Sequence, residues 1–268
     1  MTVTTSEHRI ATPEGHVYAK RWHVPVPPES SAAQARAPIL LNHDSLGAVS
    51  LWRDFPALLA QACGRDVVAY DRLGFGQSDA NPEQLKADFV ADEVQSGIAP
   101  VLAALNIEDF VLLGHSVGGG MAAEAAAHFG ARCKALITES VQTFVEDRTL
   151  QGIGEARDNF AQPGQLDRLA RYHGDKAAWV LSAWVDTWFS EAFASYSLQS
   201  AFERIQCPVL AIHGGQDEFG SLVHPENIVR WTNGAAQQEI IATGGHVPHK
   251  ETPQPLVERI AQFLQAVA

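Results

Sequence analysis

The sequence predicts an α/β protein with a mostly parallel central sheet, flanking helices and a helical insertion late in the chain. Short apolar runs without polar alternation recur between amphipathic stretches, as buried parallel strands and covering helices do. This alternation of strands and helices stops over residues 140–206, which carry several helical patterns and no buried strand. It then resumes to the C-terminus, so the parts on either side are expected to share one sheet.

The N-terminal part of the chain predicts a hairpin, a surface loop and then alternating strands and helices. A Pro13-Glu14-Gly15 turn joins alternating segments at 8–11 and 16–23, which predicts an antiparallel hairpin at the sheet edge. A Pro-, Ser- and Ala-rich stretch at 25–37 is expected to be a surface loop. Alternating strands and helices then follow at 38–42 (strand), 51–62 (helix), 66–70 (strand), 85–105 (helix), 109–114 (strand), 118–128 (helix) and 134–138 (strand).

The remaining elements complete the sheet after the insertion. Apolar periodicity predicts strands at 208–213 and 239–242 and helices at 225–231 and 256–267. In the long helix at 85–105, Gly97 and Pro100 are expected to disturb the hydrogen bonding. We expect residues 1–139 and 207–268 to form the core domain and 140–206 a helical cap. The inserted block has too few apolar positions to build a core of its own.

Composition and net charge argue against some classes of binding partner. The chain has 268 residues, 46% of them hydrophobic, and a net charge of −12, which argues against nucleic acid or an anionic membrane surface as partner. No apolar run reaches transmembrane length and the N-terminus has no apolar signal core. The three cysteines, Cys63, Cys133 and Cys207, are expected to be free thiols, which fits a reducing cytoplasm.

The chemistry is expected to centre on Gly114-His115-Ser116-Val117-Gly118. This G-x-S-x-G pattern lies between a buried strand and a helix of small residues, the context of a nucleophile elbow. The glycines leave room for a strained serine at the tip of the turn, with its hydroxyl lifted clear of the sheet. Ser116 is therefore the candidate nucleophile, the alternative being a plain helix N-cap.

A serine hydroxyl needs a general base within hydrogen-bond reach. His246 lies in a glycine-permitted loop after the last strand, at the sheet edge that also carries the elbow. His249, three residues further on, is a rival for this role. His246-x-x-His249 by itself is a weak metal signal, and no metal or other cofactor is expected.

The third catalytic group must orient the imidazole and stabilise its positive charge. Asp217 follows the strand at 208–213 and is the preferred candidate, although it could simply be a turn aspartate. Glu139, at the end of the strand after the elbow helix, and Glu218 are the alternatives.

Two backbone N–H groups are needed to stabilise an oxyanion. We expect them to come from Val117, at the start of the elbow helix, and from Ser45, in the loop after the first parallel strand. The alternative is that His43 and Asp44 merely cap that turn.

Substrate contacts are expected from aromatic residues of the cap. Trp184 and Trp188 lie four residues apart on one helix face, with Trp179 about one turn earlier. They either line an apolar substrate pocket or only pack the cap onto the sheet. Trp184, Trp188 and His115 are the candidate substrate-binding residues.

Together these motifs resemble the α/β-hydrolase superfamily, and in particular its small capped serine hydrolases. The resemblance covers nearly the whole chain and includes Asp71-Arg-Leu-Gly-Phe-Gly-Gln-Ser-Asp79 and His213-Gly-Gly-Gln-Asp217. It implies the α/β-hydrolase fold and a Ser116–His246–Asp217 triad. One departure is that many relatives carry His-Gly where this chain has His43-Asp44. Ser45-Leu46-Gly47 is similar to the loop of 3-oxoadipate enol-lactonases, which favours esters and lactones.

The sequence therefore predicts a cofactor-independent serine hydrolase of small carboxylic esters or lactones. A serine nucleophile argues against haloalkane dehalogenases and epoxide hydrolases, which use aspartate in this fold. Two alternatives stay open: a carbon–carbon bond hydrolase of the meta-cleavage type, and a non-catalytic ligand receptor. The expected partner is a small molecule, and a homodimer is compatible with the sequence.

Overall fold

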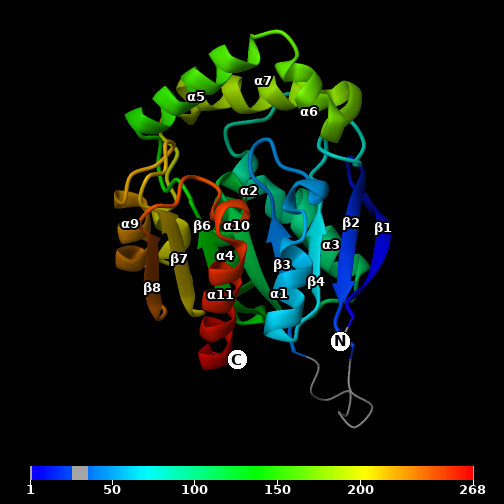
Figure 1. Cartoon of the computed structure of the whole chain (residues 1–268), viewed down its shortest axis with the longest axis vertical. Coiled ribbons are helices and arrows are strands. Elements are labelled where there is room, and N and C mark those ends of the chain that lie inside the picture. The colour runs from blue at the N-terminus through cyan, green and yellow to red at the C-terminus, as the bar shows by residue number, and fades with distance from the viewer. Residues whose placement is uncertain (1, 26–35, 268) are drawn as a thin grey trace.

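An eight-stranded sheet runs through the molecule (Figure 1) in the order β1-β2-β4-β3-β5-β6-β7-β8. The computed structural model describes residues 2–25 and 36–267. β1 pairs antiparallel with β2, as does β2 with β4, and the remaining neighbours are parallel. The strands are β1 (Thr4–Thr12), β2 (Gly15–His23), β3 (Ile39–Asn42), β4 (Val67–Tyr70), β5 (Phe110–His115), β6 (Cys133–Glu139), β7 (Val209–Gly214) and β8 (Ala236–Ile241). The predicted sheet and edge hairpin are confirmed; most of the loop expected at 25–37 lies outside the described residues.

Helices cover both faces of the sheet. They are α1 (Phe55–Cys63), α2 (Phe89–Glu93), α3 (Ala99–Ala104), α4 (Val117–Phe129), α5 (Asp147–Phe160), α6 (Gln165–His173), α7 (Ala177–Trp188), α8 (Gln199–Phe202), α9 (Val223–Trp231), α10 (Pro248–Glu251) and α11 (Pro253–Val267). On β3, Ile39 and Leu41 pack with α1 and α11, whereas Leu40 packs with α4 on the other face. Both faces of the inner strands are therefore buried, which is why their sequences are apolar throughout.

The helix expected at 85–105 is interrupted, as predicted. A π-helical turn (Val94–Ile98) separates α2 from α3. Gly97 lies in this turn and Pro100 begins the next helix, where its missing N–H is least costly.

The block between β6 and β7 holds the helices that lie across one end of the sheet. Figure 1 shows α5, α6 and α7 spread over this end of the core. The short α8 packs instead against α4 and α9. The boundaries of a separate cap at 140 and 206 remain a prediction.

The cysteines are free, as predicted, but two of them are close together. Cys133 Sγ lies 3.8 Å from Cys207 Sγ. Their separation along the chain did not indicate this contact, which follows from the pairing of β6 with β7.

Among the described helices, none combines the length and apolar character that crossing a bilayer requires.

Gly118→Ala is expected to destabilise the protein by about 1–3 kcal/mol, the usual cost of overpacking a well-packed site. A Cβ at this position would overlap the backbone oxygens of Asn42 and His43 at the end of β3, and backbone cannot move aside as a flexible side chain can. Denaturant unfolding followed by circular dichroism would measure the change.

Gly154→Ala is the matched control for this prediction. Gly154 lies within α5, where an added Cβ would meet only the Phe189 ring, at 3.8 Å. Alanine should therefore be neutral or slightly stabilising there. An equal loss of stability in both variants would contradict the steric account.

Candidate active site

Ser116 occupies the strained position that the elbow pattern predicts. It follows β5, caps α4 and has φ 53° and ψ −129°, a conformation that non-glycine residues rarely adopt. A Cβ on Gly114 would overlap the backbone of Gly118, so the two glycines of the pattern allow the strand and helix to meet at this angle. The side chain hydroxyl donates to Gln142 Oε1 at 3.3 Å.

His246 and Asp217 meet at the ends of neighbouring strands. The Nδ1 atom of His246 lies 2.9 Å from Asp217 Oδ1 and 2.8 Å from Oδ2. The carboxylate also accepts the Phe219 N–H at 2.8 Å and is 1% exposed. Burial alone would raise the pKa of Asp217, but the hydrogen bond and charge interaction with His246, together with His213 and the Phe219 N–H, outweigh it and the pKa is lowered. Asp217 is thus held ionised, and Nε2 is the nitrogen of His246 left available as a base.

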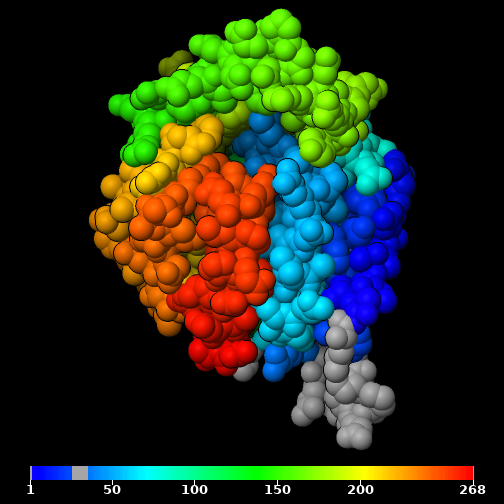
Figure 2. All heavy atoms as spheres, viewed as in Figure 1, coloured from blue at the N-terminus to red at the C-terminus, as the bar shows by residue number. Residues whose placement is uncertain are grey.

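Ser116 and His246 line the same cavity of about 170 Å³. Figure 2 shows a recess between the helices over the sheet edge and the core beneath. The lining residues are Asp44, Ser45, Leu46, Ser116, Gln142, Thr149, Ile153, Trp184, Trp188, Phe219, His246 and Val247. In this conformation the Ser116 hydroxyl bonds Gln142 rather than His246, so it has to rotate before His246 can take its proton.

The rival acid and base pair with each other. Glu139 accepts the His249 N–H at 2.6 Å, and its other oxygen lies 2.9 Å from His249 Nδ1. Both side chains are buried and neither lines the cavity of Ser116. Burial opposes ionisation of Glu139, but the charge interactions with His249 and His115 and the two hydrogen bonds from His249 together outweigh it, and the carboxyl pKa is lowered. Glu218 is exposed and does not line the cavity either.

The peptide between Asp44 and Ser45 is oriented by three donors. The Asp44 carbonyl oxygen accepts His43 Nδ1–H at 2.8 Å, Arg72 Nη2–H at 3.0 Å and the Gly47 N–H at 3.2 Å. In a trans peptide the C=O and N–H groups point in opposite directions, so the Ser45 N–H is turned away from these donors. The structure gives this N–H no acceptor among the described residues.

Val117 offers a second N–H that has no acceptor in the part of the chain that the structure describes. It is the first residue of α4, where the backbone N–H has no partner within the helix. The positive end of the helix dipole lies at the same point. Among the described residues, two N–H donors therefore lack an acceptor: that of Ser45, which lines the cavity, and that of Val117, which directly follows Ser116.

The three tryptophans differ in position. Trp184 and Trp188 line the cavity, and Trp188 also packs edge-on against Phe193. Trp179 instead contacts Phe75 edge-on, and its indole N–H donates to Glu83 O at 3.0 Å, so it fastens α7 to the loop after β4. Trp179 therefore has a packing role.

His115 does not reach the cavity as expected of a substrate-binding residue. It is 1% exposed and is not among the lining residues. Successive residues of a strand point to opposite faces, and the turn at Ser116 does not redirect the side chain that precedes it. Its actual contacts are with Asp44 and the backbone of His246.

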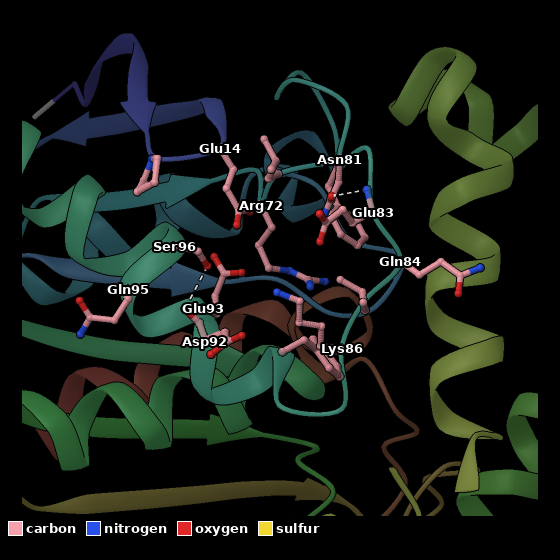
Figure 3. A pocket seen from close by; sticks show the side chains of 15 residues that line it. Glu14, Arg72, Asn81, Glu83, Gln84, Lys86, Asp92, Glu93, Gln95 and Ser96 are labelled. Atoms are coloured by element: carbon pink, nitrogen blue, oxygen red, sulfur yellow. Dashed lines mark hydrogen bonds between the residues drawn. The ribbon is translucent and has the colours of Figure 1, made fainter. Parts of the chain in front are cut away.

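A larger cavity, of about 300 Å³, lies elsewhere (Figure 3). Its wall comes from the hairpin turn, the loop after β4 and α2, and it carries charges of both signs, including Glu14, Arg72, Lys86 and Glu93. None of the candidate catalytic residues lines it. Volume alone would therefore point to the wrong place, because the nucleophile opens into the smaller cavity.

Fold and site together define an α/β hydrolase. The family model for the alpha/beta hydrolase fold matches residues 37–184, more than half of the chain, and the protein belongs to this family.

Two curated relatives show which hydrolases the chain is similar to. Human "Serine hydrolase BPHL" is 25% identical over 203 residues, covering 74% of this chain and 69% of that protein. The "2-hydroxymuconate semialdehyde hydrolase" of Pseudomonas sp. (strain CF600) is 24% identical over 248 residues, covering 85% and 86%. A solved structure, the 2-hydroxy-6-oxo-6-phenylhexa-2,4-dienoate hydrolase from Rhodococcus sp. strain RHA1, superposes with a TM-score of 0.76 at 17% identity, covering 98% of this chain and all of that one.

Sequence reasoning missed Gln142 and the Asp44 side chain. Gln142 follows β6 at the sheet edge for which Glu139 had been considered, and position along the chain was the one available signal. Its amide is oriented because Nε2–H donates to Ser140 O at 3.1 Å, which turns Oε1 toward Ser116. Asp44 had been considered only as a turn cap, yet it lines the cavity.

Proposed function

We propose that this protein is a cofactor-independent serine hydrolase that cleaves small, uncharged carboxylic esters or lactones. The observation that carries the proposal is that His246, bound through Nδ1 by the Asp217 carboxylate, lines the same cavity as the strained Ser116. This arrangement supports the assignment of Ser116 as nucleophile, His246 as base and Asp217 as the group that orients the base.

The proposed reaction proceeds in two stages. Ser116 Oγ attacks the ester carbonyl while His246 Nε2 takes its proton, and Asp217 stabilises the resulting imidazolium. The N–H groups of Ser45 and Val117 bind the oxyanion, each worth about 3 kcal/mol if they act as such donors do elsewhere. His246 protonates the departing alcohol, then activates a water that releases the acid.

The cavity favours an uncharged acyl group. Its wall is largely apolar and aromatic, with Trp184, Trp188 and Phe219, and none of the described residues that line it is a lysine or an arginine. On the polar side it has the Asp44 carboxylate and the Gln142 oxygen that faces Ser116. These groups accept hydrogen bonds and would repel a substrate carboxylate at close range. About 170 Å³ admits only a small group.

A meta-cleavage carbon–carbon hydrolase is the second candidate. It is favoured by the match to 2-hydroxymuconate semialdehyde hydrolase over most of both chains. Such a substrate carries a carboxylate, for which this cavity provides no cationic side chain.

A side-by-side assay separates the two candidates. Purified protein would be given p-nitrophenyl acetate and butyrate, a γ-lactone and a 2-hydroxy-6-oxo-dienoate, with kcat/KM as the readout. We expect kcat/KM for an ester or the lactone to exceed that for the dienoate. The reverse order would establish carbon–carbon cleavage, and turnover of none, with no labelling of Ser116 by a fluorophosphonate, would support a receptor instead.

A further inference from the structure

His115 lies between the three segments that carry the proposed catalytic groups. It is the last residue of β5, directly before Ser116. Its Nε2 atom is 2.8 Å from the backbone oxygen of His246, and its Nδ1 atom is 3.4 Å from Asp44 Oδ2. The buried His115 ring thus contacts the two loops that flank the elbow, namely the loop after β3 and the loop after β8.

Both ring nitrogens of His115 face acceptors. A peptide oxygen and a carboxylate can only accept hydrogen bonds, and a neutral imidazole has a single N–H to give. A neutral ring that donated to His246 O would turn the Nδ1 lone pair toward the Asp44 carboxylate. The imidazolium form gives an N–H to His246 O and turns its second N–H, with its positive charge, toward Asp44 Oδ2, with which it forms an ion pair at 3.4 Å.

The surrounding charges agree with a cationic ring. Asp44 faces it from the loop after β3 and Glu139 from the end of β6. On α10, the His249 ring packs edge-on against the His115 ring and is hydrogen-bonded to Glu139. The positive charge of Lys250, also on α10, favours the ionised form of Asp44. The His246 ring lies 5.0 Å away between centroids.

Two opposing effects set the protonation of the pair. Burial alone would lower the pKa of His115, but Asp44 and then Glu139 outweigh it and the pKa is raised. Burial likewise disfavours the charged form of Asp44, yet bonding to His115 holds the pKa of that carboxyl well below its usual range. The two directions agree on an ion pair.

The pair also connects to the proposed oxyanion donor. Asp44 contributes its carbonyl to the peptide whose N–H belongs to Ser45, so fixing the Asp44 side chain helps fix that N–H. Gly47 leaves the space that this arrangement needs, since a Cβ there would overlap Asp44 Oδ1 and the His43 side chain. The loop thus accommodates the Asp44 carboxylate beside His43.

We propose that His115, held as an imidazolium by Asp44, is a positioning residue that keeps the Ser45 N–H and the His246 loop in register with Ser116. It touches no substrate. The inference rests on the proposed hydrolase function and adds that this positioning fails when the ring loses its proton.

The test compares pH–rate profiles of the wild type, His115→Asn and Asp44→Asn on one p-nitrophenyl ester. Because the pKa of His115 is raised, its ion pair with Asp44 is present at lower pH and is lost as the pH rises through that pKa. Wild-type kcat should therefore fall on the alkaline side. In Asp44→Asn the fall should move to lower pH. In His115→Asn it should disappear, with kcat about 10- to 100-fold lower at neutral pH, as misplacement of catalytic groups costs, and KM little changed.

His128→Asn, an exposed histidine on α4, is the control and should keep the wild-type profile. If His115→Asn folds and keeps either wild-type kcat or the wild-type alkaline fall, the proposal is overturned. Should that variant not fold, ¹⁵N spectra of the wild-type histidine rings decide: two protonated nitrogens on His115 at neutral pH support the proposal and one refutes it. Labelling of wild-type Ser116 by a fluorophosphonate separates this failure from failure of the hydrolase function itself.

Discussion

Ser116→Ala is expected to lower kcat for p-nitrophenyl butyrate by at least about 10⁴-fold, since removal of a triad nucleophile leaves only binding and oxyanion stabilisation. The substitution removes one hydroxyl whose single protein hydrogen bond is to Gln142, so the fold should survive. Turnover measured with circular dichroism of the same sample would check both parts.

Ser200→Ala is the matched control, because this serine is exposed on α8. It should keep wild-type turnover. Near wild-type activity in Ser116→Ala, with a folded spectrum, would show that another group attacks the substrate and would remove the basis of the proposed function.

The second large effect is expected for Asp217→Asn, with kcat lowered by about 10³- to 10⁴-fold. Asparagine keeps the size of the side chain but replaces a carboxylate oxygen by an N–H₂ group. It can therefore hold His246 in the wrong tautomer and cannot stabilise its positive charge. Steady-state kinetics at neutral pH, with KM determined separately, would measure the loss.

Glu139→Gln tests the rival assignment with the same chemical change. Glu139 is bonded to His249, away from the cavity, so we expect its loss to reduce stability through a broken buried pair more than it reduces kcat. A larger fall in kcat for Glu139→Gln than for Asp217→Asn would reverse the two roles.

The fold was predictable because its signals are local. Uniformly apolar strands such as β3 and β5 can be buried only between two layers of helices, and a G-x-S-x-G turn between strand and helix has one favourable geometry. Even the break in the helix at 85–105 follows from Gly97 and Pro100, whose effects are confined to their own backbone.

The candidate site was predictable only in part. Parallel strands share one carboxyl edge, and this rule brought Ser116, Asp217 and His246 together before any side chain was placed. It brought Glu139 and His249 to the same edge just as well. Only packing separated the two acid–base pairs: His246 of one pair lines the cavity, whereas neither Glu139 nor His249 does.

The sequence by itself determined which segments form strands and helices, where the elbow lies and which residues can reach one edge of the sheet. These features depend on the periodicity of apolar residues and on neighbours in the chain. Tertiary structure alone decided that Gln142 bonds the Ser116 hydroxyl, that Trp179 packs rather than lines the cavity, and that His115 contacts Asp44 and the His246 backbone without lining the cavity. The reason is physical. Which face a side chain presents depends on rotamers and on groups dozens of residues away, and no periodicity in the chain encodes those contacts.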